Sequence, residues 1–157
     1  MELCVVSCGK KKIWNKQKNA PHRVPAAKAY VGTLTRLAIK YAELFYPNSW
    51  VILSGKYGFL YPWEEIENYD IKLTKLSEEF INKLRRQIAE KSLYKYSKVI
   101  VLGGENYVEA CLKAFASYDI PVEAPLSRLG MFERVRVLSR AIKERLKIED
   151  ILCRRIA

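Results

Sequence analysis

The sequence predicts an α/β protein, built as a three-layer α/β/α sandwich around a parallel sheet. Short apolar runs rich in β-branched residues alternate along the chain with longer segments of helical periodicity. Such runs are typical of strands that a parallel sheet buries on both faces. The length of 157 residues fits a single domain that spans residues 1–157.

Strands are expected where the apolar runs are densest, at Leu3–Ser7, Trp50–Ser54, Lys98–Leu102 and Val122–Ala124. Helices are expected at Ala26–Phe45, Ser77–Leu93, Asn106–Ser117 and Met131–Leu146. Pro47 ends the first helix, and Ser77 with two acids after it is a good N-cap for the second. Residues 148–157 are either a short terminal helix or a basic tail.

The charge is strongly positive and unevenly spread. The chain holds 28 basic and 17 acidic residues, a formal net charge of +11. Nine bases and two acids fall in residues 1–50, and no Asp or Glu lies between Leu3 and Ala42. A Lys-rich surface of a thermophile would explain the balanced later segments. The acid-free segment instead favours a polyanionic partner.

Several classes of protein are excluded. No apolar run approaches the roughly 18 residues of a membrane span. Glu2 stands where a signal peptide carries a base, so a cytoplasmic protein is expected. The four cysteines lack C-x-x-C spacing and His22 is the only histidine. We therefore expect reduced thiols, no metal site and no cofactor.

The basic loop that begins at Cys8 follows the first expected strand and is the leading candidate site. Gly9 would let backbone amides face an anion, while Lys10 and Lys11 neutralise it. Lys12, with a pKa lowered by neighbouring cations, is the candidate catalytic nucleophile. Cys8 is also a candidate catalytic residue. The alternative is a solvated basic turn in which Cys8 only fills space.

In parallel sheets, ligands bind where the strands end. Four segments are expected at that edge: residues 8–23, 55–73, 103–107 and 125–130. The residues expected to bind nucleic acid or phosphate there are Gly9, Lys10, Lys11, Arg23, Lys56, Tyr57, Gly58, Tyr69, Gly103, Gly104, Tyr107, Ser127 and Arg128.

Lys56 and Tyr57 lie between two glycines, in a loop that would bring a cation and an aromatic face to one ligand. Stacking of Tyr57 on a base is worth on the order of 1–3 kcal/mol. The spacing excludes an ATP-hydrolysing P-loop. The alternative is a strand-exit turn in which Tyr57 covers the edge of the core.

The long connection Pro62–Leu73 is expected to be a lid or binding loop. Asp70 in it is the candidate proton-accepting or water-orienting carboxylate, although a turn cap or a pair with a lysine fits equally well. Aromatic side chains alternate over this region, a pattern typical of a core wall as much as of base platforms.

Gly103 and Gly104 open a helix, and helix N-termini attract phosphate through free amides. A tight strand-to-helix turn is the alternative, because the pattern G-x-G-x-x-G is absent. His22, beside Arg23, is expected at the surface or on a phosphate, and no Ser-His-Asp arrangement is indicated.

The ordered motifs are Ser7–Lys12, Pro25-Ala26…Tyr30…Gly32, Leu53–Leu60, Tyr69-Asp70, Leu102-Gly103…Tyr107 and Pro125-Leu126…Leu129-Gly130. Together they resemble a family of uncharacterised microbial domains related to the YaaA-type proteins. Gly55 and Phe59 stand where that resemblance implies Ala and Leu.

The strand–helix order and the Pro125-Leu126-Ser127 segment also resemble a minimal uracil-DNA-glycosylase-like fold. This resemblance implies a parallel four-stranded sheet of order 2-1-3-4, with a base pocket among the four loops. Lysines replace the water-activating Asp or Asn of such enzymes, and Val122–Ala124 stands where a His is expected. The resemblance therefore concerns the fold more than glycosidic hydrolysis.

The segment Cys8-x-x-x-Lys12-Ile13-Trp14 is similar to the Cys-x-x-x-Lys-Pro-Tyr loop of archaeosine synthase, with Ile13 replacing the proline. The resemblance implies that Lys12 attacks the nitrile of a deazaguanine in RNA, with Lys10 and Lys11 lowering its pKa.

Three functions therefore stay open. The first is an enzyme that recognises or modifies a nucleobase in a nucleic acid, by deazaguanine or nitrile chemistry or by base excision. The second is a non-catalytic DNA- or RNA-binding domain, and the third is an enzyme of a free nucleotide. The expected partner is DNA, RNA or a nucleotide and not a membrane; the oligomeric state stays open.

Overall fold

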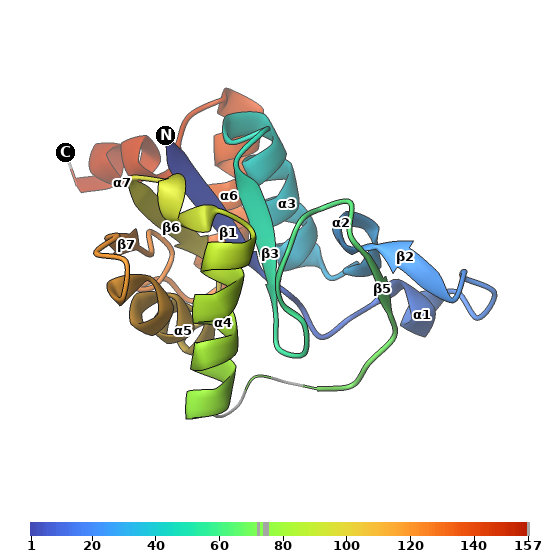
Figure 1. Ribbon diagram of the computed structural model, residues 1–157. Helices are drawn as coiled ribbons and strands as arrows, with labels where there is room; N and C mark the ends of the chain where they lie inside the picture. Colours follow the sequence, from blue (N-terminus) through green and yellow to red (C-terminus); the bar gives the residue numbers. More distant parts are fainter. Residues whose placement is uncertain (72, 74–75, 157) are drawn as a thin grey trace.

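The computed structural model describes residues 1–71, 73 and 76–156. Its centre is a sheet of five strands in the order β4-β3-β1-β6-β7 (Figure 1). Four of them are parallel: β1 (Glu2–Ser7), β3 (Trp50–Ser54), β6 (Lys98–Leu102) and β7 (Val122–Glu123). The fifth, β4 (Gly58–Leu60), runs antiparallel to β3 at one edge.

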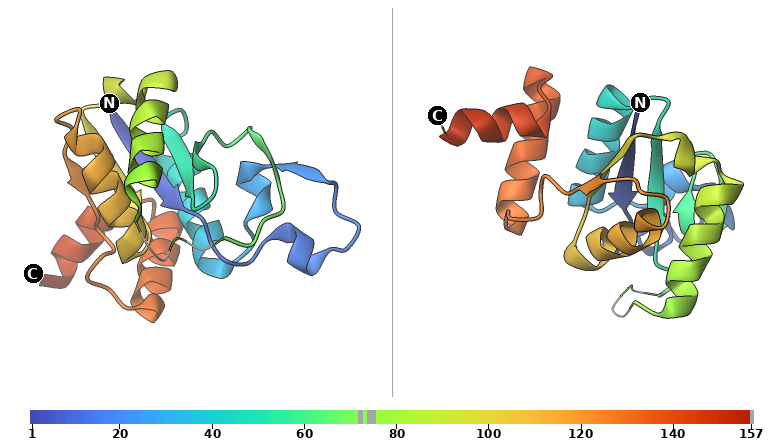
Figure 2. Two further views of the ribbon diagram at one scale, coloured as in Figure 1. Left: turned by 60° about the horizontal axis from the view of Figure 1, so that its bottom comes forward. Right: turned by 60° about the vertical axis from the view of Figure 1, so that its left-hand side comes forward.

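Helices cover both faces of this sheet, which confirms the α/β class. On one face lie α3 (Thr33–Phe45), α6 (Met131–Glu144) and α7 (Ile148–Ile156), and on the other lie α4 (Glu78–Glu90) and α5 (Glu105–Ala116) (Figures 1 and 2). Successive residues of β1 enter opposite cores, since Cys4 and Val6 pack in one and Leu3 and Val5 in the other.

The expected sheet of four parallel strands is wrong in strand count and in order, because β4 adds an antiparallel edge. Gly58 has a positive φ of 74°, which lets the chain turn back directly after β3. The Ser54 hydroxyl accepts hydrogen bonds from the amides of Lys56 and Tyr57 within this turn. The Gln87 side chain, on α4, fixes it by accepting from the Phe59 amide and donating to the Tyr57 carbonyl.

The expected helix Ala26–Phe45 is also wrong, since it is two helices, α2 (Ala26–Ala29) and α3. Tyr30 between them is extended, with φ −99° and ψ 118°, and forms an antiparallel bridge with Lys12. The Val31 amide donates to the Lys11 carbonyl at 3.0 Å. Burial of the whole Tyr30 side chain and this pairing outweigh the helical pattern of the local sequence.

The two long connections fold against each other instead of staying irregular. The first contains α1 (Ile13–Lys16) and β2 (Arg23–Pro25), and β2 pairs antiparallel with β5 (Glu65–Glu67) from the second. The expected loop Pro62–Leu73 therefore includes a strand; its residue 72 lies outside the described residues.

The remaining boundaries shift by a few residues. The second expected helix ends at Glu90 and is followed by the short 3-10 helix η1 (Leu93–Lys95). For the end of the chain, where a terminal helix and a basic tail were both expected, residues 148–156 are helical. Residue 157 lies outside the described residues. None of the helices in the described part of the chain has the length and hydropathy of a membrane span.

Candidate functional site

The order of the parallel strands creates a crevice between β1 and β6. The strand that follows β1 in the chain, β3, lies on one side of β1, and β6 lies on its other side. The connections that leave β1 and β6 therefore run in opposite directions and leave a crevice at the carboxyl ends of these two strands. A cavity of about 400 Å³ lies there, which we call the switch-point cavity. Its walls come from the loop after β1, the start of α3, the loop after β6 and the start of α6.

The charge that lines this cavity is of one sign. Lys10, Lys11 and Arg134 line it, and none of the described residues that line it is Asp or Glu. Arg134 is partly committed, because its Nε donates to the carbonyls of Leu126 at 3.1 Å and Leu129 at 2.9 Å. Lys10 and Lys11 are exposed, so their ammonium groups are available to a ligand.

Three helices begin at the switch-point cavity, each after a glycine. Gly32, Gly104 and Gly130 are the N-caps of α3, α5 and α6, and none of the three helices has a side-chain cap. Gly32, Gly104 and the first residue of α6, Met131, line the cavity. Uncapped N-termini present free amides and a partial positive charge. The convergence of three of them gives this part of the cavity a partial positive charge, which suits an anion.

These N-cap glycines are not required by the backbone. Their φ angles are −66°, −75° and −72° with extended ψ, which any residue adopts. A Cβ added at Gly104 or Gly130 would meet no atom within 4 Å. A capping Ser or Asp would therefore fit, and its side chain would occupy the amides that glycine leaves open.

Two other glycines bring the walls together. A Cβ at Gly9 would lie 2.5 Å from Thr35 Oγ1 on α3, and one at Gly103 would lie 2.3 Å from Ser7 Oγ at the end of β1. Real Cβ atoms do not approach so closely, so a side chain at either position would displace Thr35 or Ser7. Gly9 and Gly103, expected as phosphate contacts, thus line the cavity and also close its walls.

Cys8 and Tyr107, both expected at the site, meet in the wall of the cavity. The distance from Cys8 Sγ to Tyr107 Oη is 3.3 Å. Burial raises the pKa of the Tyr107 phenol above its usual range, and the nearby Cys8 raises it further. Tyr107 is therefore neutral at neutral pH and able to donate a hydrogen bond.

A second concavity, which we call the Lys12 hollow, lies on the other side of the basic loop. It measures about 560 Å³ and is lined by Lys10, Lys11, Lys12, Asn15, Asn68, Tyr69 and Asp70. Lys10 and Lys11 therefore line both spaces. Asp70, expected to be a proton-accepting or water-orienting carboxylate, is exposed and lines this hollow.

Lys12 differs from its two neighbours because its side chain turns inward. It is 6% exposed, and its Nζ lies 4.3 Å from the centroid of the Tyr69 ring. Nζ also donates to the Lys10 carbonyl at 3.3 Å. Among the described residues no carboxylate forms an ion pair with it.

A chain of hydroxyl groups underlies the Lys12 hollow. Tyr69 Oη lies 2.6 Å from Tyr30 Oη and 2.8 Å from Ser54 Oγ. Burial raises the pKa of both phenols above their usual range, with the Cys8 sulfur the next cause for each. The Tyr69 ring is thus held by its neighbours and presents its face to the Lys12 ammonium.

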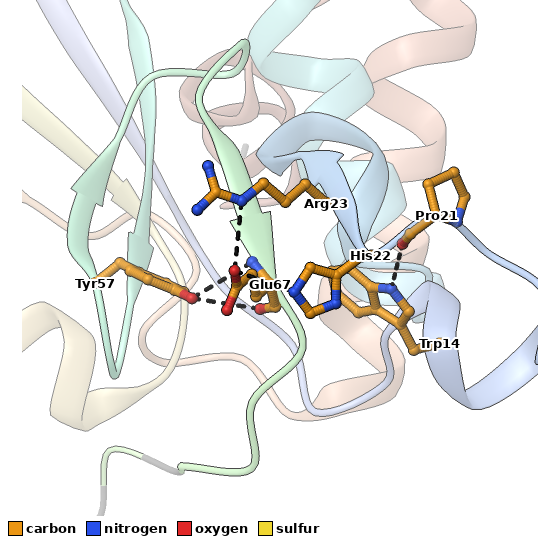
Figure 3. A network of polar contacts seen from close by, with 6 residues as sticks. All are labelled: Trp14, Pro21, His22, Arg23, Tyr57 and Glu67. Atoms are coloured by element: carbon orange, nitrogen blue, oxygen red, sulfur yellow. Dashed lines mark hydrogen bonds and ion pairs between the residues drawn. The ribbon is translucent and has the colours of Figure 1, made fainter.

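Other expected site residues lie outside both spaces. Arg23 Nε and His22 Nε2 lie 3.4 Å and 3.2 Å from Glu67 Oε1, on the small β2–β5 sheet (Figure 3). Tyr57 packs edge-on against Tyr69 at 5.4 Å between centroids, and its hydroxyl contacts the Glu67 backbone (Figure 3). Tyr57 is therefore half-buried in a wall and does not offer a free stacking face.

The remaining expected residues are more peripheral. The Lys56 ammonium lies 5.1 Å from the Tyr57 ring centroid. Gly58 is buried as the first residue of β4, so its expected phosphate contact is replaced by a backbone role. Ser127 and Arg128 are exposed on the loop before α6 and line neither space.

Sequence reasoning missed the contributions of Gly32, Gly130, Arg134 and Asn68. A signal for the first two was present, since glycine directly precedes three helical segments where Ser, Thr or Asp would be usual. Arg134 and Asn68 carry no local motif, and only the tertiary fold brings them to the site.

Two further observations limit the chemistry. In the described part of the chain, no group of three or more His, Cys, Asp and Glu side chains is placed to hold a metal ion. A groove of about 600 Å³ between α6 and α7 is larger than the switch-point cavity. Its charged side chains include the ion pairs Arg136–Glu133 and Arg140–Glu144, and it lies away from the strand ends.

Comparison with known proteins places the chain in a family. Residues 3–140 match a family of unknown function, DUF6884, and the chain belongs to it. The chain is also similar to the uncharacterized protein YfjM of Bacillus subtilis (strain 168), with 35% identity over 147 residues, 91% of this chain and 96% of that protein. No solved structure matches the chain significantly.

Proposed function

We propose that the protein binds a nucleotide, free or within a nucleic acid, with a phosphate in the switch-point cavity. The observation that carries the proposal is the convergence of three uncapped helix N-termini and two exposed lysines on one cavity, whose described lining residues include no carboxylate. Backbone amides and ammonium groups are the partners that proteins use for phosphate.

The rest of the cavity suits the apolar part of such a ligand. Leu34, Ala38, Leu102, Leu126 and Leu138 line it beside the polar groups. Its volume of about 400 Å³ falls within the range of small-ligand pockets, roughly 300–1,000 Å³. An apolar wall beside an anion site fits a nucleoside phosphate better than inorganic phosphate.

Nucleobase chemistry is a second candidate, favoured by the buried Lys12 ammonium near Asp70 at the second hollow. It would agree with the resemblance to the archaeosine synthase loop and with relation to the YaaA-type proteins. A uracil-DNA-glycosylase-like fold is supported by the succession β3-β1-β6-β7 of the parallel strands. On this proposal Lys12→Ala abolishes turnover of a modified or extruded base and scarcely alters binding. Equal, modest losses from Lys10→Ala, Lys11→Ala and Lys12→Ala would instead favour a binding domain that tracks phosphates.

Calorimetric titration with 5′-nucleoside monophosphates and with short DNA and RNA strands tests the binding proposal. Lys10→Ala and Lys11→Ala are each expected to weaken binding about tenfold, the loss of a charge-assisted hydrogen bond. Lys40→Ala, an exposed lysine of α3 away from the cavity, is the matched control. Equal losses in all three variants would show nonspecific attraction to a basic surface, and no binding to any of these ligands would refute the proposal.

A further inference from the structure

Lys10 and Lys11 form a shared wall between two spaces of different character. The switch-point cavity on one side has helix N-termini and apolar walls, and no carboxylate is among the described residues that line it. The Lys12 hollow on the other side has two amides, an aromatic ring and the Asp70 carboxylate. A ligand group bound in one space lies directly across this wall from the other.

The Lys12 hollow has the properties of a built subsite. Lys12 lines it, is 6% exposed and meets no carboxylate in the described part of the chain. An ammonium has three donors, and the described residues provide it with one oxygen acceptor, the Lys10 carbonyl. A buried cation without an anionic partner is costly, so an acceptor from a ligand would compensate it.

The floor beneath Lys12 is rigid. Tyr69 is fixed through the hydroxyl groups of Tyr30 and Ser54, from α2–α3 and β3. The Asn15 side chain accepts a hydrogen bond from the Lys12 amide at 2.9 Å, which holds the loop where it enters α1. The position of the ammonium is therefore set before any ligand arrives, as a preorganised site requires.

The chemistry of the hollow differs from that of the cavity. Asp70 repels a phosphate but accepts hydrogen bonds from the N–H groups of a base, and Asn68 both donates and accepts. The Lys12 ammonium would meet a carbonyl or ring nitrogen of the same base. The hollow thus suits the polar edge of a nucleobase, whereas the cavity suits a phosphate.

We infer that the two spaces bind two consecutive nucleotides of one nucleic acid strand. The phosphate of one nucleotide occupies the switch-point cavity, the linking backbone crosses Lys10 and Lys11, and the neighbouring base edge enters the Lys12 hollow. The inference rests on the proposed function and adds the substrate class, a single strand of at least two nucleotides rather than a free mononucleotide.

Binding of 5′-phosphorylated nucleotides of one, two and three residues tests this inference, in both deoxyribo and ribo forms. The dinucleotide is expected to bind about tenfold more tightly than the mononucleotide, through the additional polar contacts in the hollow. The third residue is expected to add little.

Asn68→Ala and Lys12→Met remove contacts in the hollow only. Both are expected to bring dinucleotide affinity to within about threefold of the mononucleotide value, while mononucleotide affinity stays unchanged. Asn68 is exposed, so its replacement leaves a folded protein even if Lys12→Met does not. Asn19→Ala, which changes an exposed amide between α1 and β2 outside both spaces, is the matched control and is expected to change neither affinity.

The outcomes are separable. Mononucleotide and dinucleotide binding with equal affinity would overturn the inference and leave the proposed function standing. A preference for the dinucleotide that persists in the Asn68→Ala variant would also overturn the inference and leave the proposed function standing. No binding of any of these ligands would overturn both. A dinucleotide preference that Asn68→Ala removes and Asn19→Ala retains supports the inference.

Discussion

The switch-point cavity and the Lys12 hollow share two lysines and differ in almost everything else. The cavity obtains part of its positive potential from backbone amides at helix ends, which side-chain substitution does not remove. The hollow depends on one buried ammonium and on the side chains around it. The comparison teaches that three consecutive lysines occupy two different environments: Lys10 and Lys11 are exposed on the wall between the two spaces, and Lys12 is part of the folded interior.

The largest expected effect comes from the shared wall. Lys10→Ala combined with Lys11→Ala should weaken nucleotide binding about 100-fold, because two charge-assisted contacts are lost. Isothermal titration at low salt would measure it, with Lys28→Ala plus Lys40→Ala as a control of equal charge. An equally large loss in the control would mean that net charge alone drives binding, without the cavity.

The next effect comes from the N-cap of α5, where one substitution should raise stability and weaken binding. Gly104→Asp should cap α5 and raise the free energy of unfolding by a few tenths of a kcal/mol. It should also weaken nucleotide binding about tenfold, because its carboxylate occupies the amides and repels phosphate. Gly104→Ser supplies a cap without charge, so it should weaken binding less. Unchanged affinity in Gly104→Asp would remove α5 from the site.

A smaller effect concerns the floor of the hollow. Tyr69→Phe removes the hydroxyl shared with Tyr30 and Ser54 and should lower the free energy of unfolding by about 1–2 kcal/mol. Mononucleotide affinity should stay the same, because the cavity does not include Tyr69. Urea unfolding measures the first effect, with Tyr94→Phe as an exposed control. A tighter or weaker mononucleotide complex would show that the two spaces are not independent.

The smallest effect is alkaline destabilisation, to which both regions contribute. Burial raises the pKa of Tyr30, Tyr69 and Tyr107 in the folded protein, so the unfolded chain, with tyrosine pKa values of about 10, releases these protons first. The stability that these phenols contribute is full below pH 10 and falls as the pH rises further. At pH 10 each phenol should cost about 0.4 kcal/mol, measurable by urea unfolding at pH 8 and pH 10. The Tyr30→Phe substitution should therefore lower the free energy of unfolding less at pH 10 than at pH 8. An equal loss at both pH values would contradict this cause.

The parallel strands β1, β3 and β6 could be predicted because each is a short apolar run between polar segments. The strand β4 could not, since Gly58-Phe59-Leu60 is too short to show a period. The pairing of β2 with β5 joins three-residue segments about forty positions apart, and no local pattern indicates it. The interruption at Tyr30 is hidden because Ala, Tyr and Val continue a helical pattern.

The candidate site was also predicted in part, where it depends on the order of the strands and not on contacts between distant segments. The position of the basic loop after β1 follows from topology, so Cys8, Gly9, Lys10, Lys11, Gly103, Gly104 and Tyr107 do meet at one cavity. The inward turn of Lys12 could not be foreseen, because its burial depends on Tyr69 and on the bridge to Tyr30. The small β2–β5 sheet holds Arg23 away from that cavity, although Arg23 lies in the connection after β1. The turn between β3 and β4 does the same for Lys56 and Tyr57, which follow β3.

The most direct test of phosphate binding at the helix ends is an amide NMR titration with a nucleoside 5′-monophosphate. The amide signals of Thr33, Glu105 and Met131, the first residues of α3, α5 and α6, should shift together with one dissociation constant. Shifts confined to Asn15, Asn68 and Asp70, or spread over exposed lysines far from the strand ends, would contradict the account.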